Sequence, residues 1–248
     1  MKLFRLAIEP DEEIKWHSYA TAENSSQVLC LNAFGSLRHS IFDHVRNKLV
    51  AEFVTGAFDS MATDGRPRRW SIGVEVENPD LLGEHGGGTQ PTSIDALLTT
   101  TEDVVTLEAK FDSDAQNGFG SCSQPGAKKC SGNYGPGSDL KGGTSAFCRL
   151  ENWDGLRSPR LYWALGKRFF QPALFQPGSK CAFASYHYQL MRNFLFAAAY
   201  ATQEGKRRFG MLIVCPKERT AVVRRQLETI QNGCSSRRIP LSGCTAEL

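Results

Sequence analysis

The chain has 248 residues, of which 41% are hydrophobic and 22% charged, and its formal net charge is +3. These proportions are ordinary for a soluble globular protein, and a net charge this small does not decide between classes of partner. The sequence contains no apolar run long enough to span a membrane, which excludes a membrane-spanning protein. The length suits one large domain, and we predict a single domain over residues 1–248.

Cellular location and cysteine chemistry are linked in this sequence. Residues 1–10 lack the long apolar stretch of a secretory signal, so we expect a cytoplasmic protein without membrane contact. Eight cysteines in that compartment are not expected to form a disulfide framework. Cys30 and Cys215 lie in apolar segments and are expected to be buried as small hydrophobic residues.

The first expected elements are two helices, over residues 25–34 and 37–55. The second helix carries apolar residues at helical spacing, namely Leu37, Ile41, Phe42, Val45, Leu49 and Phe53. At ~100° per residue, Glu52 falls inside that apolar stripe, so its carboxylate is expected to face the interior and to need a partner. Lys48 lies close to it on the same helix, and a structural ion pair is the alternative to a functional role.

Three strands are expected next. Residues 69–77 alternate between apolar and polar side chains, with Ser71, Gly73, Glu75 and Glu77 on the polar face. After a loop over residues 78–91, the segments 92–98 and 104–111 are apolar runs that each carry charged residues.

The charges on the second and third strands are the most informative feature of the chain. Side chains two residues apart on a strand point to the same face, so Glu108 and Lys110 are expected to stand side by side, with Ala109 turned away. A hairpin through residues 99–103 would bring Asp95 across from them. A salt-bridged pair on a solvated face is the usual meaning of such a pattern, but the apolar flanks here favour an interior sheet.

Two carboxylates held close together repel each other unless a cation lies between them. Their hard oxygen ligands suit Mg²⁺ or Mn²⁺, and an ammonium beside the ion can orient a water and stabilise a charged transition state. Asp95, Glu108 and Lys110 therefore indicate a metal-dependent phosphodiester hydrolase.

Residues 112–144 are rich in Gly, Ser, Asn and Pro and form a longer irregular stretch than ordinary loops, so we predict an insertion over residues 112–150. A structural zinc site would order such a segment, and its four candidate ligands are Cys122, Cys130, Cys148 and Cys181. The spacing lacks a C-x-x-C pair, so separate thiols stay an alternative, as does an iron–sulfur cluster.

The remaining chain predicts helical structure within residues 150–170 and 186–203, a strand over residues 209–215 and a C-terminal helix over residues 217–232. Basic residues cluster at positions 66–69, 206–208, 219–225 and 237–238. These clusters suit phosphate contacts or solvated surface equally well.

This order of elements, with an acid and an acid-x-lysine on the second and third strands, resembles the PD-(D/E)XK nuclease superfamily. Thr92-Ser93-Ile94-Asp95 stands where the "PD" element falls, and Glu108-Ala109-Lys110 matches "(D/E)xK". Proline is absent directly before Asp95, a common variation in the superfamily. Ser25-Ser26-Gln27, Asn32-x-Phe34-Gly35, the cysteine-containing insert and residues 186–193 are similar to a bacterial branch of restriction-endonuclease-like proteins, and the likeness covers residues 25–216.

The resemblance implies an α/β fold with a restriction-endonuclease-like αβββαβ core, in which helices flank a mixed sheet and the Cys/Gly-rich segment is an insertion. It also implies an Mg²⁺ or Mn²⁺ ion held by Asp95, Glu108 and the backbone carbonyl of Ala109, with Lys110 positioning the water. Glu52 corresponds to an acid that many members place near the metal. Gln189 lies on a polar helix face that some branches direct at the site, and it shares this face with Tyr186, Arg192 and Asn193.

The expected activity is hydrolysis of nucleic acid, DNA in preference to RNA and as an endonuclease rather than an exonuclease. A homodimer would suit a double-strand cutter. Two alternatives stay open at this point. One is a nuclease-fold module that binds nucleic acid without cutting it, and the other is a zinc-braced interaction domain.

Overall fold

The computed structural model describes residues 26–38, 43–57, 68–85, 91–110, 160–176, 181, 183, 187–233 and 241–245. The predicted insertion over residues 112–150 lies outside these ranges, together with Cys122, Cys130 and Cys148. In the part of the chain that is described, no helix is both long enough and apolar enough to cross a membrane.

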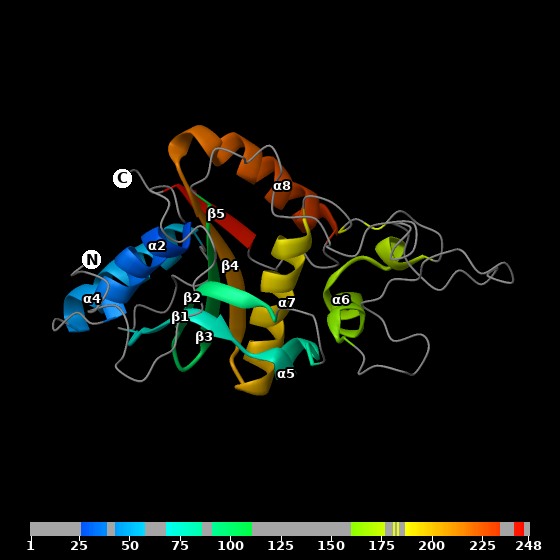
Figure 1. The fold of residues 1–248 in the computed structure, drawn as a ribbon, viewed down its shortest axis with the longest axis horizontal. Helices are drawn as coiled ribbons and strands as arrows, with labels where there is room; N and C mark the ends of the chain where they lie inside the picture. Colours follow the sequence, from blue (N-terminus) through cyan, green and yellow to red (C-terminus); the bar gives the residue numbers. More distant parts are fainter. Residues whose placement is uncertain are drawn as a thin grey trace, which may run out of the picture.

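A five-stranded mixed sheet forms the centre of the fold, with its strands in sequence order (Figure 1). Strand β1 (Ser71–Glu77) pairs antiparallel with β2 (Ser93–Thr99), and β2 pairs antiparallel with β3 (Asp103–Ala109). Strands β4 (Arg208–Cys215) and β5 (Leu241–Thr245) continue the sheet in parallel from β3. Parallel neighbours need a crossover connection, which helices supply on both occasions.

The first helical segment lies on one face of the sheet. It comprises α2 (Ser26–Cys30), a π-helical turn η1 (Leu31–Gly35), α3 (Ser36–Arg38) and then α4 (Asp43–Ala57). The first helix was expected to end at residue 34, but helical structure continues through Gly35 into α3. Figure 1 shows α2 and α4 against one face of the sheet and α7 against the other, with α6 beyond α7.

Later helices cover the opposite face and one end of the sheet. Helix α7 packs on β3 and β4, and α8 packs on β4 and β5. The short helix α5 lies within the connection from β1 to β2, where Asn78 caps its start by accepting a hydrogen bond from the Asp80 N–H and Gly83 ends it at φ 64°. The bounds are α5 Pro79–Leu82, α6 Tyr162–Phe169, the 3₁₀ turn η4 Pro172–Phe175, α7 Tyr188–Gln203, the 3₁₀ turn η5 Lys217–Arg219 and α8 Thr220–Gly233.

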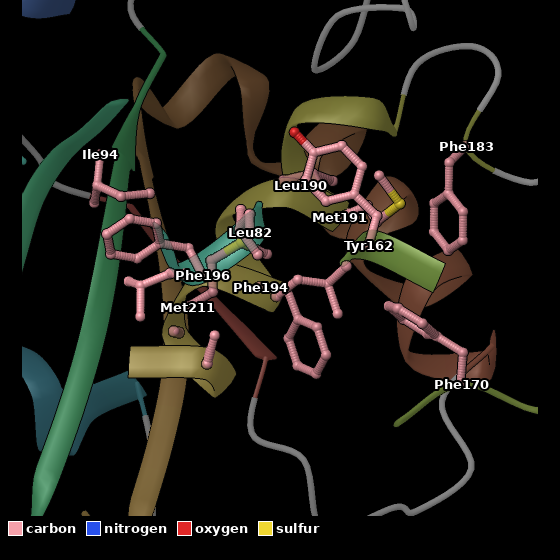
Figure 2. Close-up of a cluster of buried hydrophobic side chains, with 14 of the residues drawn as sticks. Leu82, Ile94, Tyr162, Phe170, Phe183, Leu190, Met191, Phe194, Phe196 and Met211 are labelled. Carbon is pink, nitrogen blue, oxygen red and sulfur yellow. The ribbon is translucent and has the colours of Figure 1, made fainter. Parts of the chain in front are cut away.

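Two hydrophobic clusters lie on the two faces of the sheet. One joins α2, η1 and α4 to the strands through residues such as Leu31, Val50 and Val54. The other extends from Ile94 on β2 across α7 to the aromatic side chains of the α6 region, and Figure 2 shows this continuity from Ile94 through Phe196 and Phe194 to Phe170 and Phe183. The sheet is thus buried on both sides, which explains why every residue of β3 is buried.

The side chains of β1 and β2 change from one face of the sheet to the other at one point. Val74 and Ala96 belong to the α2-side cluster, whereas Val76 and Ile94 pack in the α7-side cluster. Regular alternation would keep Val74 and Val76 on one face. The change occurs at Glu75, which has φ 49°, and the β1–β2 register places Glu75 opposite Asp95.

The predicted order of a helix, three strands, a helix and a strand is confirmed, as are the mixed sheet and its flanking helices. Strand β5 and helix α5 are additions that the sequence did not indicate. The predicted single domain stays a prediction.

Candidate active site

Glu108, the penultimate residue of β3, lies at the centre of the candidate site and is 1% exposed. Two amides of α7 hold its carboxylate: Gln189 Nε2 donates to Oε1 at 2.7 Å, and Asn193 Nδ2 donates to Oε2 at 2.7 Å. Residues four apart lie on the same face of a helix, so this pair follows from the helical repeat. Gln189 and Asn193, which both belong to the polar helix face that the resemblance directed at the site, therefore reach Glu108.

Lys110 stands beside Glu108, as the alternation of strand side chains predicted. Its Nζ lies 2.7 Å from Glu108 Oε1, and its side chain is 29% exposed. The Lys110 N–H donates to the carbonyl of Val214 at 2.8 Å, so strand β4 fixes the backbone here. The ammonium is thus held by a buried carboxylate while it still reaches solvent.

Asp95 lies across the β2–β3 pair from Glu108, since Ala96 pairs with Leu107 in the antiparallel register. Its Oδ2 accepts a hydrogen bond from the Ala109 N–H at 2.7 Å. Burial raises the pKa of Asp95 well above its usual value and the charge of Glu108 raises it further, whereas the Ala109 N–H and Lys110 lower it. The hairpin thus brings the predicted acids together, and their catalytic role stays a prediction.

Glu75 on β1 is the residue of this site that sequence reasoning missed. Its φ of 49° is a left-handed conformation that costs a non-glycine residue ~1–2 kcal/mol. Ser93 Oγ donates to Oε2 at 3.2 Å, while Oε1 is buried without a hydrogen-bond partner. Burial raises the pKa of Glu75, and the charge of Glu108 adds to this, although hydrogen bonds from Gln27 and Ser93 lower it. Its place on the polar face of a strand beside Asp95 was the available signal.

Helix α2 forms the wall behind these acids. The Cys30 thiol on α2 is buried, and this burial raises its pKa well above the usual value. The negative charges of Asp95, Glu75 and Glu108 each raise it further. Three carboxylates from three adjacent strands therefore all act electrostatically on this one buried thiol.

The charge balance and ligand types of this cluster bear on metal binding. Among the described residues, Lys110 is the ammonium that accompanies these three carboxylates, and no described residue donates a hydrogen bond to Glu75 Oε1. Within the described ranges, no three Asp, Glu, His or Cys side chains are already grouped closely enough to hold an ion. Both oxygens of Glu108 are instead engaged by amides and Lys110. In charge and in hard oxygen ligands, the residues fit a divalent cation such as Mg²⁺ or Mn²⁺.

A second buried acid lies next to the site and explains the position of Arg192. Glu84 accepts hydrogen bonds from the Thr92 N–H at 2.6 Å, from Thr92 Oγ1 at 2.7 Å and from the Tyr162 hydroxyl. Arg160 and Arg192 approach the same carboxylate at 3.6 and 3.4 Å, and Arg192 Nε also donates to Thr92 Oγ1 at 2.8 Å. This network ties α7 to the residue before β2, so Arg192 holds the strand that carries the first predicted acid.

The prediction that Glu52 faces the interior is wrong. Its side chain is 63% exposed and lies 3.9 Å from Lys48 Nζ, which is the structural ion pair considered as the alternative. Val50 and Val54 are the buried residues of this helix, whereas Val45 and Leu49 are exposed. The buried face is therefore rotated away from the stripe that placed Glu52 inside, and Glu52 is not part of the site described above.

The predicted zinc site stays a prediction. Cys181 is half-buried and packs against the α7-side cluster. Its three proposed co-ligands lie outside the described residues. The predicted burial of Cys30 and Cys215 is confirmed.

Comparison with protein families matches residues 4–238 to REase-ARP, a family described as restriction endonuclease associating with ARP. The chain belongs to this family. A search of the curated proteins and one of the solved structures both gave no match. Membership of the REase-ARP family confirms the restriction-endonuclease-like resemblance and indicates a nuclease-like function, with nucleic acid as the class of substrate.

Proposed function

We propose that the chain is a metal-dependent nuclease that hydrolyses phosphodiester bonds of DNA and acts as an endonuclease. The observation that carries this proposal is the Lys110 ammonium held 2.7 Å from the buried Glu108 carboxylate, across the strand pair from Asp95. In a member of a restriction endonuclease family, this combination is the one that phosphodiester hydrolysis requires.

In this proposal, Asp95 and Glu108, with the carbonyl of Ala109, would hold Mg²⁺ or Mn²⁺. A bound ion would supply Lewis-acid chemistry, because it polarises a phosphoryl oxygen and makes water more acidic. The raised pKa of Asp95 reflects burial beside other carboxylates, and a cation would relieve that repulsion.

Lys110 would act on the water and on the phosphate. Its ammonium is half-buried and already oriented by Glu108, so it needs little reorganisation to donate hydrogen bonds. One of these would position the attacking water, and the charge would offset the negative charge that develops on the phosphate. Gln189 and Asn193 would keep the Glu108 carboxylate in place, each through one hydrogen bond.

Cleavage of supercoiled plasmid with Mg²⁺ or Mn²⁺ tests the proposal. We expect the wild type to nick or linearise the plasmid and Glu108→Gln to leave it supercoiled. The matched control is Glu102→Gln, because Glu102 precedes the opposite end of the same strand and pairs with Arg207 and Arg208. It should cut like the wild type. Equal cutting by Glu108→Gln would contradict the proposal.

A nuclease-fold module that binds nucleic acid without cutting it is the alternative outcome of this assay. Such a module would retard the plasmid in a gel with or without the divalent ion and would leave it supercoiled. The same assay on an RNA substrate separates DNA from RNA preference. A homodimer and a cytoplasmic location stay predictions.

A further inference from the structure

The backbone at Glu75 carries the observation from which this inference starts. Among the described residues, Glu75 is the one non-glycine residue with a positive φ. Glycine adopts this conformation without steric cost, so the sequence retains a glutamate where the backbone favours glycine. Residues in such strained conformations cluster at functional sites, so the Glu75 side chain is a candidate functional group.

The place of this conformation in the sheet is specific. Pairs of the β1–β2 ladder are formed on both sides of it, at Val74 with Ala96 and at Val76 with Ile94. The same register puts Glu75 opposite Asp95. At this position the side chains of β1 and β2 change from the α2 side of the sheet to the α7 side. The left-handed residue thus turns the Glu75 side chain toward α2, where Gln27 bonds it, and toward the acids of β2 and β3.

The carboxylate of Glu75 is incompletely satisfied in that position. Oε2 accepts a hydrogen bond from Ser93 Oγ at 3.2 Å, whereas Oε1 is buried and accepts none from the residues that the structure describes. Buried polar atoms normally have a partner, so an unsatisfied one requires an explanation. The neighbouring charges of Glu108 and Asp95 are negative, which disfavours an ionised carboxylate further unless a cation is present.

A purely structural role does not explain these features together. Hydrogen bonds to Gln27 and Ser93 can be formed equally well by a neutral amide side chain at position 75. A glycine at position 75 would adopt the left-handed backbone conformation without steric cost. Neither requirement calls for a negative charge, but a divalent cation does.

We propose that Glu75 supplies a third carboxylate to the divalent cation of this site, alongside Asp95 and Glu108. The inference rests on the proposed function, because that function introduces the cation. It assigns to β1 the additional acid that the sequence placed on the helix at Glu52.

Mn²⁺ binding to the full metal-free chain, measured by isothermal titration calorimetry, tests the inference without any cleavage step. We expect Glu75→Gln to raise the dissociation constant for Mn²⁺ by about 10-fold or more, as other substitutions at metal sites do. Glu52→Gln is the matched control, because it removes the same charge from an exposed acid. It should bind Mn²⁺ like the wild type.

A second readout separates a metal-binding role from a structural one. Glu75→Gly removes both the left-handed strain and the charge, so its melting temperature without metal should equal or exceed that of the wild type while Mn²⁺ binding is weakened. Lower metal-free melting temperatures in both Glu75 variants, or a Glu75→Gln dissociation constant within twofold of the wild-type value, would overturn the inference.

Failure of this inference can be distinguished from failure of the proposed function. If Asp95→Asn loses Mn²⁺ binding and Glu75→Gln keeps it, only the role of Glu75 is refuted. If the wild type binds no Mn²⁺ and cuts no nucleic acid, both proposals fall.

Discussion

The two ends of strand β3 both carry a buried acid, yet they are neutralised differently. At the start of the strand, Asp103 accepts hydrogen bonds from Arg68 at 2.8 Å, from Arg208 at 2.6 Å and from Thr100 Oγ1 at 2.8 Å. At the other end, Glu108 lies near two further carboxylates and has Lys110 as its cation.

Within a single strand, this difference separates an acid that arginines neutralise from an acid that we assign to the proposed metal site. Asp103 has two guanidinium partners, and the same holds for Glu84 beside Arg160 and Arg192. Buried charges are retained at low cost when they are paired and hydrogen-bonded. Among the residues that the structure describes, the acids near Lys110 outnumber the cations, and the proposed divalent ion would add the missing positive charge.

The largest expected effect is on stability and concerns Asp103, at the start of β3. Asp103→Ala would leave Arg68 and Arg208 without their buried partner, and breaking a buried pair in this way costs about 3–5 kcal/mol of the free energy of unfolding. Urea unfolding measures it. A loss below about 1 kcal/mol would show that Asp103 is not the structural acid that the comparison requires.

The next effect concerns catalysis at the other end. Lys110→Ala should lower plasmid cleavage by about 100- to 1000-fold, the usual consequence of removing one preorganised stabilising group. Lys206→Ala is the control lysine, because Lys206 Nζ bonds the carbonyl of Thr100 at the opposite end of the sheet. Equal losses in both variants would remove the distinction between the two ends.

A smaller effect is the pH dependence of the metal-free protein. The pKa of Asp95 is raised by burial and by Glu108, so between about pH 4 and the raised pKa the folded state keeps a proton that the unfolded state has lost. The contribution of Asp95 to stability is therefore complete below about pH 4 and is lost as the pH rises.

Asp95→Asn removes this titration. The melting temperature of the variant should therefore rise relative to that of the wild type as the pH increases from 4 to 8. Thermal melts of both proteins without metal measure the difference. Parallel curves would mean that the acids near Lys110 do not destabilise the metal-free protein.

The smallest expected effect concerns Glu84, the other buried acid with two arginine partners. Tyr162→Phe removes one hydrogen-bond donor from Glu84, which keeps the N–H and hydroxyl of Thr92 and two guanidinium groups. We expect a loss of about 1 kcal/mol in urea unfolding. A much larger loss would show that the arginines do not balance Glu84 without the tyrosine.

The strands and the central pair of acids were predictable because they depend on local periodicity. Alternation alone places Glu108 beside Lys110, and one short hairpin brings Asp95 opposite them. Gln189 was predicted through the resemblance, and its contact with Glu108 follows from the packing of α7 on β3.

The errors come from features that a sequence does not encode locally. Apolar residues occur all around α4, so the stripe through Val45 and Leu49 selected a face that the fold leaves exposed, and Glu52 was placed inside with it. Glutamate has no intrinsic preference for a positive φ, so the left-handed conformation of Glu75 could not be predicted from the residue type. Strand β5 depends on long-range pairing with β4, which no local pattern announces.

The contacts of Glu108 determine when the site can form during synthesis of the chain. Gln189 and Asn193 follow Glu108 in the chain by 81 and 85 residues, and the Val214 carbonyl that fixes Lys110 is made later still. Contacts this distant form late, after the intervening chain has left the ribosome. A nascent chain that ends before α7 lacks the amides that orient the carboxylate. An activity toward DNA that depends on this carboxylate would therefore first arise after α7 and β4 have been synthesised.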